Sequence, residues 1–235
     1  MSSLDKLHNF VDALPLPVRE ALDAVSSSRQ LAADARLLRS GVVPNEVFQI
    51  VEGRVKYSAW DHLGRETVLT HMTRGDWVGL SEMFTELPAI WNVEAQGPVT
   101  VRVIKRRAFG RLVDAHPELS RQLLKLFALR FSLHRLFGLD HSALSLKERL
   151  IKMLYFLSFS YDKEAGGAQA IVMQLSQEEL GKIVGASRQK LNPALKALER
   201  EQLLDVHFGG LTLRSRAAIL QRYGHLLQAL DPIPR

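Results

Sequence analysis

The chain has 235 residues, of which 46% are hydrophobic and 24% are charged; these proportions are average for a globular protein and exclude a disordered one. It contains no cysteine, which excludes disulfides, thiolate-ligated metals and cysteine-ligated iron–sulfur clusters. Lysine and arginine exceed aspartate and glutamate by 31 to 25, and most of the excess follows residue 140, which favours a polyanionic partner.

The sequence also lacks the marks of an enzyme, a metalloprotein or a membrane protein. It contains no G-x-S-x-G, H-E-x-x-H, P-loop or G-x-G-x-x-G pattern, and its histidines lack the spacing of metal ligands. The N-terminus has no basic start before an apolar run, and no uncharged apolar stretch approaches about 18 residues. We therefore expect a cytoplasmic protein with no catalytic residues, no metal site and no membrane contact.

Residues 41–104 are predicted to form β-structure. Their β-branched and aromatic segments partly alternate with polar residues, and short glycine-bearing breaks separate them. Glu52-Gly53 has the composition of a two-residue hairpin turn. Closely spaced strands of this kind predict a small roll or barrel, with helices before it over Val11–Leu22 and after it over Arg106–Val113. The expected strands are Val47–Val51, Arg54–Trp60, Glu66–Met72 and Val99–Ile104.

A long helix is predicted from Pro117 to about Leu139, and it is apolar on two faces. It is either a core helix buried within one chain, or a helix with one face on the β-structure and the other in a coiled-coil-like dimer seam. We favour the dimer. The expected seam follows one row at spacings of three and four, interrupted by Arg130: Leu119, Leu123, Leu126, Leu133 and Phe137.

The remaining residues are predicted to be mostly helical, with a short β tail. After an amphipathic helix over Leu146–Phe159, Ser176 begins a Ser-x-x-Glu capping box, Gly185 can end that helix, and Ser187 can cap a second one. A β-hairpin around Gly209-Gly210 follows. Two short helices joined by a glycine turn and followed by a hairpin predict a winged helix-turn-helix.

The residues of the second helix of this motif form an apolar stripe on one side and a polar, basic face on the other. Amide and basic groups of this kind read base edges and hold phosphates in a DNA major groove. The alternatives are a solvated face or a winged helix that docks on protein and no longer binds DNA. The residues expected to contact DNA are Ser176, Gln177, Ser187, Arg188, Gln189, Lys190, Asn192, Lys196 and Arg200.

These segments resemble the Crp/Fnr family of bacterial transcription regulators. The resemblance is carried by EELGKIVGASRQ and LKALEREQLL within Gln177–Leu204, and by Gly41, Gly53, DHLGRE and GDWVG in the β-rich part. It implies an α+β protein. Residues 1–116 would form a cyclic-nucleotide-binding-like β-roll (a double-stranded β-helix), 117–141 a dimerisation helix and hinge, and 142–235 a winged helix-turn-helix.

The resemblance also implies function. It implies a homodimer that binds an operator of two half-sites in double-stranded DNA and acts with RNA polymerase, under the control of a small-molecule effector. Arg188 matches the family's guanine-contacting arginine, and Ser176 and Gln177 match its phosphate-contacting helix start. Pro193 stands where some members have a second base-reading arginine, so their operator is not expected here.

The sensor part departs from the family's nucleotide-binding pattern. Members that bind a cyclic nucleotide use a carboxylate for the ribose and an arginine–serine pair for the phosphate. Leu80 stands at the carboxylate position with Glu82 two residues away, Ile90 and Trp91 stand at the pair, and no basic residue occurs over Gly75–Gln96. Because a buried phosphate needs a cation, we do not expect the usual binding of cyclic AMP. The candidate pocket comprises Gly79, Leu80, Ser81, Glu82, Ile90, Trp91, Arg130, His134 and Arg135.

The sequence is compatible with effectors other than cyclic AMP. Arg102, Arg130 or Arg135 could supply a cation for a different anionic ligand. A haem-based gas sensor would need an axial histidine, for which His71, His134 and His141 are candidates, but a lone histidine is more often structural. The sequence therefore does not identify an effector or a cofactor.

Overall fold

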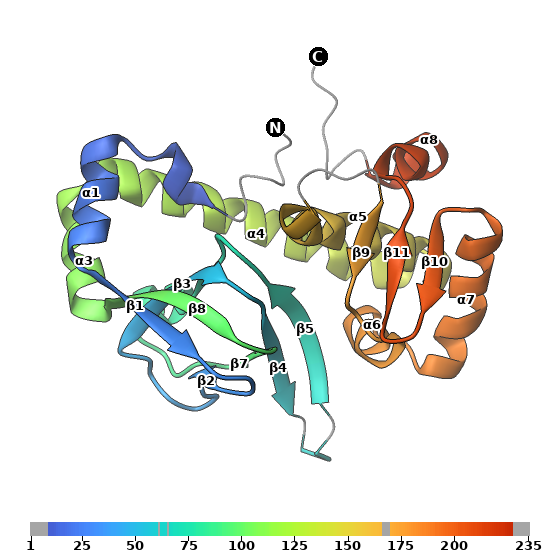
Figure 1. Ribbon diagram of the computed structural model, residues 1–235, viewed down its shortest axis with the longest axis horizontal. Helices are drawn as coiled ribbons and strands as arrows, with labels where there is room; N and C mark the ends of the chain where they lie inside the picture. The colour runs from blue at the N-terminus through green and yellow to red at the C-terminus, as the bar shows by residue number, and fades with distance from the viewer. Residues whose placement is uncertain (1–8, 61, 65, 166–169, 228–235) are drawn as a thin grey trace. The chain divides into compact units, whose positions relative to one another are not determined.

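The computed structural model describes residues 9–227, apart from 61, 65 and 166–169 (Figure 1). The chain divides between residues 130 and 131 into two compact units, and this division falls inside the long helix α4 (Pro117–Ala143). Sheets dominate the first unit, and helices around a small sheet form the second, which confirms the α+β class. In the described ranges, no helix is long and apolar enough to cross a bilayer.

The first unit contains two four-stranded antiparallel sheets, ordered β1-β8-β3-β6 and β2-β7-β4-β5. Inward-facing aliphatic and aromatic side chains of both sheets form one core, with Phe48, Ile50 and Val101 from one sheet and Val55 and Val93 from the other. This arrangement confirms the predicted roll. Its strands are β1 (Ser26–Leu31), β2 (Arg36–Leu38), β3 (Glu46–Glu52), β4 (Val55–Trp60), β5 (Glu66–Met72), β6 (Trp77–Val78), β7 (Asn92–Ala95) and β8 (Val99–Lys105).

The turn at Glu52-Gly53 differs from the expected hairpin. Strands β3 and β4, which it joins, belong to different sheets and do not pair with each other. Gly53 has φ of +85°, and a Cβ placed there would lie 2.5 Å from the carbonyl oxygen of Pro98. Glycine is therefore required at this corner, where the chain passes from one sheet to the other.

Short helices pack on the roll. The helix expected over Val11–Leu22 is broken: a 3-10 turn, η2 (Phe10–Ala13), precedes α1 (Leu16–Ala24), because Pro15 takes the extended conformation at the N-cap. Helices α2 (Leu80–Thr85) and α3 (Arg106–Ala115) follow β6 and β8. The buried Trp77 ring joins these parts, with its centroid 5.4 Å from that of Phe10 and 5.6 Å from that of Phe109.

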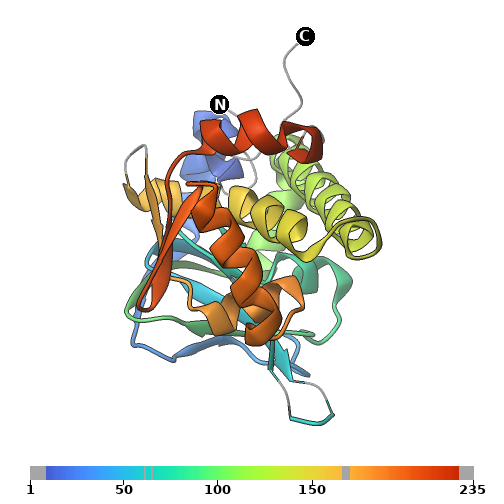
Figure 2. The same cartoon turned by 90° about the vertical axis from the view of Figure 1, so that its right-hand side faces the viewer.

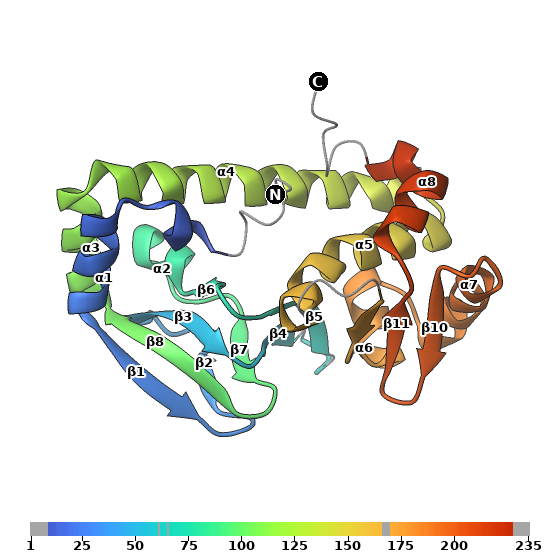
Figure 3. The same ribbon diagram turned by 45° about the horizontal axis from the view of Figure 1, so that its top comes forward.

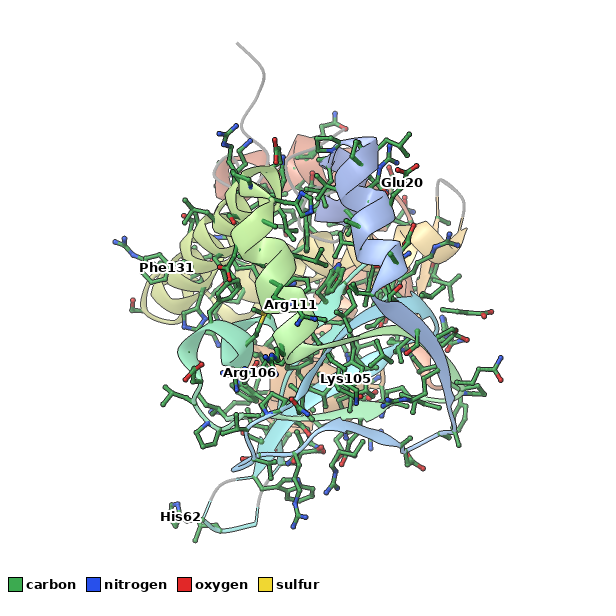
Figure 4. The ribbon with its side chains drawn as sticks, turned by 90° about the vertical axis from the view of Figure 1, so that its left-hand side faces the viewer. Glu20, His62, Lys105, Arg106, Arg111 and Phe131 are labelled. Atoms are coloured by element: carbon green, nitrogen blue, oxygen red, sulfur yellow. The ribbon has the colours of Figure 1, made fainter. Side chains whose placement is uncertain are left out.

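Helix α4 runs without interruption over 27 residues (Figure 3). The row expected in the dimer seam is already covered: Leu119, Leu123, Leu126 and Leu133 are buried within the single chain. Among the α4 side chains that the structure describes, the large exposed apolar ones are instead Leu124, at 70% exposure, and Phe131, at 62%, the latter labelled in Figure 4. This burial corrects the residues assigned to the seam. The side chain of Phe137 lies outside the described part of the chain.

The second unit packs helices around a three-stranded antiparallel sheet ordered β10-β11-β9. Its core is formed by Leu150 and Leu154 of α5 with Leu191 and Leu195 of α7. The elements beyond α4 are α5 (Leu146–Ala165), β9 (Ile171–Met173), α6 (Gln177–Val184), α7 (Arg188–Arg200), β10 (Leu204–His207), β11 (Gly210–Leu213) and α8 (Arg216–Leu227).

Candidate nucleic-acid interface and sensor site

Helix α6 begins and ends through side-chain and glycine signals visible in the sequence. The Ser176 hydroxyl accepts the Glu179 amide at 3.2 Å, and the Glu179 carboxylate accepts the Ser176 amide at 3.0 Å, which completes the predicted capping box. Gly185 ends the helix at φ of +68°. A Cβ on Gly181 would lie 2.6 Å from the carbonyl oxygen of Ala186, so glycine is required where the chain turns back.

Helix α7 follows this turn and lies in front in Figure 2. The Ser187 hydroxyl accepts the Lys190 amide at 3.4 Å and caps the helix. The predicted apolar stripe of Leu191, Ala194, Leu195 and Leu198 is buried. The opposite face is open to a partner: Arg188, Gln189, Lys190, Pro193, Lys196 and Arg200 are exposed, and Asn192 is half-buried beside them.

The open face carries four cations, and the two acids near its C-terminal end are held in internal hydrogen bonds. Glu199 accepts the amide of Val206 at 2.9 Å. Glu201 accepts hydrogen bonds from Lys147 at 2.9 Å and from the Tyr223 hydroxyl at 2.7 Å. Burial alone would raise the pKa of Glu201, but these hydrogen bonds outweigh it and hold the pKa below its ordinary value. Both carboxylates therefore serve the fold, and the cations face outward.

The two helices bring most of the expected contact residues into one unit. Ser176 and Gln177 lie half-buried at the start of α6, and Ser187 is exposed at the start of α7. Pro193 lies inside α7, which continues through it. The Arg200 guanidinium donates to the carbonyl oxygen of Lys196 at 3.2 Å, so it lies along the helix in this structure.

In the first unit, a polar cluster surrounds Tyr57, a residue that the sequence analysis did not single out. The phenol oxygen accepts the amide of Gly79, and Arg130, Glu82 and Asp76 lie near it. Burial raises the pKa of Tyr57 well above its ordinary value; Glu82 and Asp76 add to the rise, while Arg130 opposes it. The phenol therefore stays protonated and neutral at physiological pH. Tyr57 lies two residues after the buried Val55 on β4, and this alternation of side chains could have indicated that Tyr57 also faces the interior of the roll.

The candidate pocket residues do not all gather at this cluster. Gly79, at φ of +86°, begins α2, Leu80 is buried, and the buried Glu82 accepts the Ser81 hydroxyl at 3.0 Å. Ile90, at 72% exposure, lies on the surface, and Trp91 is half-buried.

The remaining sensor candidates are scattered. His134 and Arg135 are exposed on the part of α4 that belongs to the other unit. His71 is buried in β5, and the side chain of His141 lies outside the described residues. Within the described ranges, no group of three or more His, Asp or Glu side chains is placed to hold a metal ion.

Comparison with known proteins agrees with this architecture. Residues 28–116 match the cyclic nucleotide-binding domain family, and residues 148–222 match the Crp-like helix-turn-helix domain. A CRP-like cAMP-activated global transcriptional regulator of Mycobacterium tuberculosis is 30% identical over 151 residues, covering 64% of this chain and 67% of that protein. The cAMP-activated global transcriptional regulator CRP of Pasteurella multocida is 24% identical over 173 residues, covering 73% and 82%.

Solved structures share the fold at low identity. FixK2 from Bradyrhizobium japonicum superimposes with a TM-score of 0.71 at 20% identity, covering 90% of this chain and all of that one. A CooA mutant from Carboxydothermus hydrogenoformans gives 0.65 at 18% identity, covering 88% and 89%. A β-roll followed by a long helix and a winged helix-turn-helix defines a class of transcription regulators. This chain belongs to the Crp/Fnr family, with a DNA-binding helix-turn-helix.

Proposed function

We propose that this protein binds a two-half-site operator as a homodimer and controls transcription by RNA polymerase, through a sensor that does not use cyclic AMP in the usual way. The outward face of α7 carries the first part of this proposal: it is polar and basic, and the acids near its end are held in internal contacts. A face of this composition on the second helix of a helix-turn-helix fits a DNA major groove.

Base readout should concentrate at the N-terminal end of α7. Arg188 can bind guanine through two hydrogen bonds, and Gln189 can do so with adenine. Pro193, at the middle of the face, has no long side chain that could reach a base. We assign the cations beyond it, Lys196 and Arg200, to contacts with phosphates. Ser176 and Gln177, at the start of α6, would hold a phosphate in the positive field of that helix end.

The Lys196→Ala variant tests the phosphate contacts. We expect it to weaken binding to all duplex sequences alike and to reduce the slope of log affinity against log salt by about one for each protomer bound. The measurement is a fluorescence-anisotropy titration at several salt concentrations. Lys182→Ala is the matched control, because Lys182 lies on α6 and pairs with Glu178 at 3.1 Å. A wild-type affinity that does not depend on salt would contradict DNA binding through this face.

The dimer part of the proposal rests on the exposed side of α4. Seven exposed residues follow one another at alternating steps of three and four, as the a and d positions of a coiled coil do. Leu124, Ala128 and Phe131 form its apolar centre, and the Arg135 guanidinium lies 5.8 Å from the centre of the Phe131 ring. The row is Arg121, Leu124, Ala128, Phe131, Arg135, Gly138 and Ser142.

The sensor is not expected to take cyclic AMP in the usual mode. The buried Leu80 and the surface residue Ile90 offer neither the carboxylate nor the cation that a cyclic nucleotide needs, and the Tyr57 phenol already accepts the Gly79 amide. A different anionic effector could use Arg130, which faces this cluster.

Calorimetric titration with cyclic AMP checks the sensor prediction. We expect no binding tighter than roughly 1 mM, because the phosphate charge would be desolvated without a matching partner. The same preparation should bind DNA, which shows that the protein is folded. Micromolar affinity for cyclic AMP would contradict the prediction and would mean that a cation from another element reaches the phosphate.

A further inference from the structure

The wing of the second unit is a tightly built hairpin with an aromatic tip. Strands β10 and β11 pair from Leu204↔Leu213 to His207↔Gly210, which leaves Phe208 and Gly209 as the turn. Gly209 has φ of +76°, and a Cβ on Gly210 would collide with the carbonyl oxygen of Met173 in the neighbouring β9. The backbone at the tip is therefore fixed by glycines, and it presents the Phe208 side chain in a defined direction.

Phe208 is fully exposed, while the other large apolar side chains of the hairpin are not. Leu204, Leu211 and Leu213 are buried in the unit. The tip ring contributes nothing to the core of this unit. A whole phenylalanine in water forgoes the roughly 1.5–3 kcal/mol that burial would provide, so a partner that covers it gains that amount.

The surroundings of Phe208 indicate what kind of partner can cover it. The nearby hairpin side chains are polar, so the ring is an isolated apolar point and not part of a flat apolar patch of the kind that binds protein. The only acid among the residues of β10 and β11 is Asp205, which accepts two hydrogen bonds from Arg214, including Nε to Oδ2 at 2.7 Å. No free carboxylate on either strand repels a phosphate backbone.

The tip also lies where DNA would be. Figures 1 and 2 both draw the β10–β11 turn at the same end of the unit as α6 and the N-terminal end of α7. A duplex that receives α7 in its major groove presents a minor groove on the other side of the adjoining phosphate backbone. That groove is about 6 Å wide, and apolar side chains are inserted into it as wedges by several DNA-binding proteins.

We propose that Phe208 is a DNA-contacting residue whose ring enters the minor groove beside each half-site and packs against sugars and base-pair edges there. This inference rests on the proposed function, because it requires α7 in the adjoining major groove. An apolar ring does not recognise the pattern of hydrogen-bond donors and acceptors in the groove. Its contact depends on the width of the groove and on how easily the base-pair steps deform. Sequences flanking the half-sites should therefore influence affinity without contacting α7.

The test compares Phe208→Ala with Val172→Ala on one operator. Val172 is also exposed and lies on β9 of the same sheet, opposite Thr212 and outside the β10–β11 turn, so it controls for loss of a surface apolar side chain. We expect Phe208→Ala to weaken binding about tenfold and to remove hydroxyl-radical protection of the flanking minor groove, while Phe208→Leu retains most of both. Val172→Ala should bind within about twofold of wild type. Circular dichroism should show that all variants keep the wild-type fold.

Three results would overturn the proposal, and the DNA-binding and transcription measurements distinguish them. If Phe208→Ala binds with wild-type affinity and footprint and activates transcription normally, the ring contacts neither DNA nor a protein partner. If instead DNA binding is unchanged but transcription activation is lost, the ring docks on a protein. A wild-type protein that binds no duplex overturns the proposed function itself, and this outcome is recognised before any variant is compared.

Discussion

Replacing Lys152 with methionine should lower the free energy of unfolding by about 3–5 kcal/mol. The Lys152 ammonium lies 2.8 Å from Oδ1 of Asp140, and the two side chains are 3% and 9% exposed. Among the described residues, Oδ2 of Asp140 has no hydrogen-bond partner, so the lysine provides the main compensation for this carboxylate. Without the lysine, a buried negative charge is left unpaired where α4 meets α5.

Urea denaturation of the full chain, followed by circular dichroism, measures this effect. Lys182→Met is the control: its partner Glu178 is on the surface, so the loss should stay below about 1 kcal/mol. The double variant Asp140→Leu with Lys152→Met should recover most of the stability, because it removes both charges. A Lys152→Met protein as stable as the control would show that the pair is not a buried one.

Placing a charge at Phe131 should convert the proposed dimer to monomer. In Phe131→Glu, a carboxylate from each protomer would replace the apolar centre of the α4 seam, and Arg135, one turn away on the same helix, can pair with that charge but cannot restore the lost apolar contact. Sedimentation velocity should then give a monomer, and affinity for a two-half-site operator should fall by about 10²–10⁴, since each half-site is bound separately. Leu124→Glu should act in the same way.

The matched control is Leu16→Glu, a charge on an exposed leucine of α1 outside α4. It should sediment as wild type does. A charge at the buried Leu126 should behave differently again, because it would unfold the first unit and not merely separate protomers. Phe131→Glu and Leu124→Glu variants that remain dimers would place the seam on another surface.

The helix-turn-helix was predictable because its signals are local. The Ser176–Glu179 capping box, the glycine turn at Gly185 and the stripe on α7 each act within a few residues, and the structure contains all three. The first strand, β1, could not be found in this way. Its sequence, SSSRQL, is polar, and it is a strand because it pairs along its whole length with β8.

Two other features of the structure could not be predicted because they depend on residues far apart in the sequence. Both faces of α4 are apolar at the same spacing, so the sequence alone does not say which face the same chain covers; the burial of Leu119 and Leu123 decides it. Tyr57 is separated by more than twenty residues from Gly79 and by more than seventy from Arg130, and only the folded unit, with the roll and the first part of α4, brings their groups together. The family resemblance pointed to Gly79 but gave no reason to expect a tyrosine there.

Selection from a pool of randomised duplexes tests the central claim most directly. The wild-type protein should enrich an inverted repeat whose half-sites lie about 10 base pairs apart, centre to centre, or a multiple of that spacing. Arg188→Ala should lose about 1–3 kcal/mol of binding and relax the preference at one base pair in each half-site, whereas Lys196→Ala should keep the wild-type preference. A pool that yields no repeated motif, or an Arg188→Ala profile identical to that of wild type, would contradict the account of α7 as the helix that reads DNA.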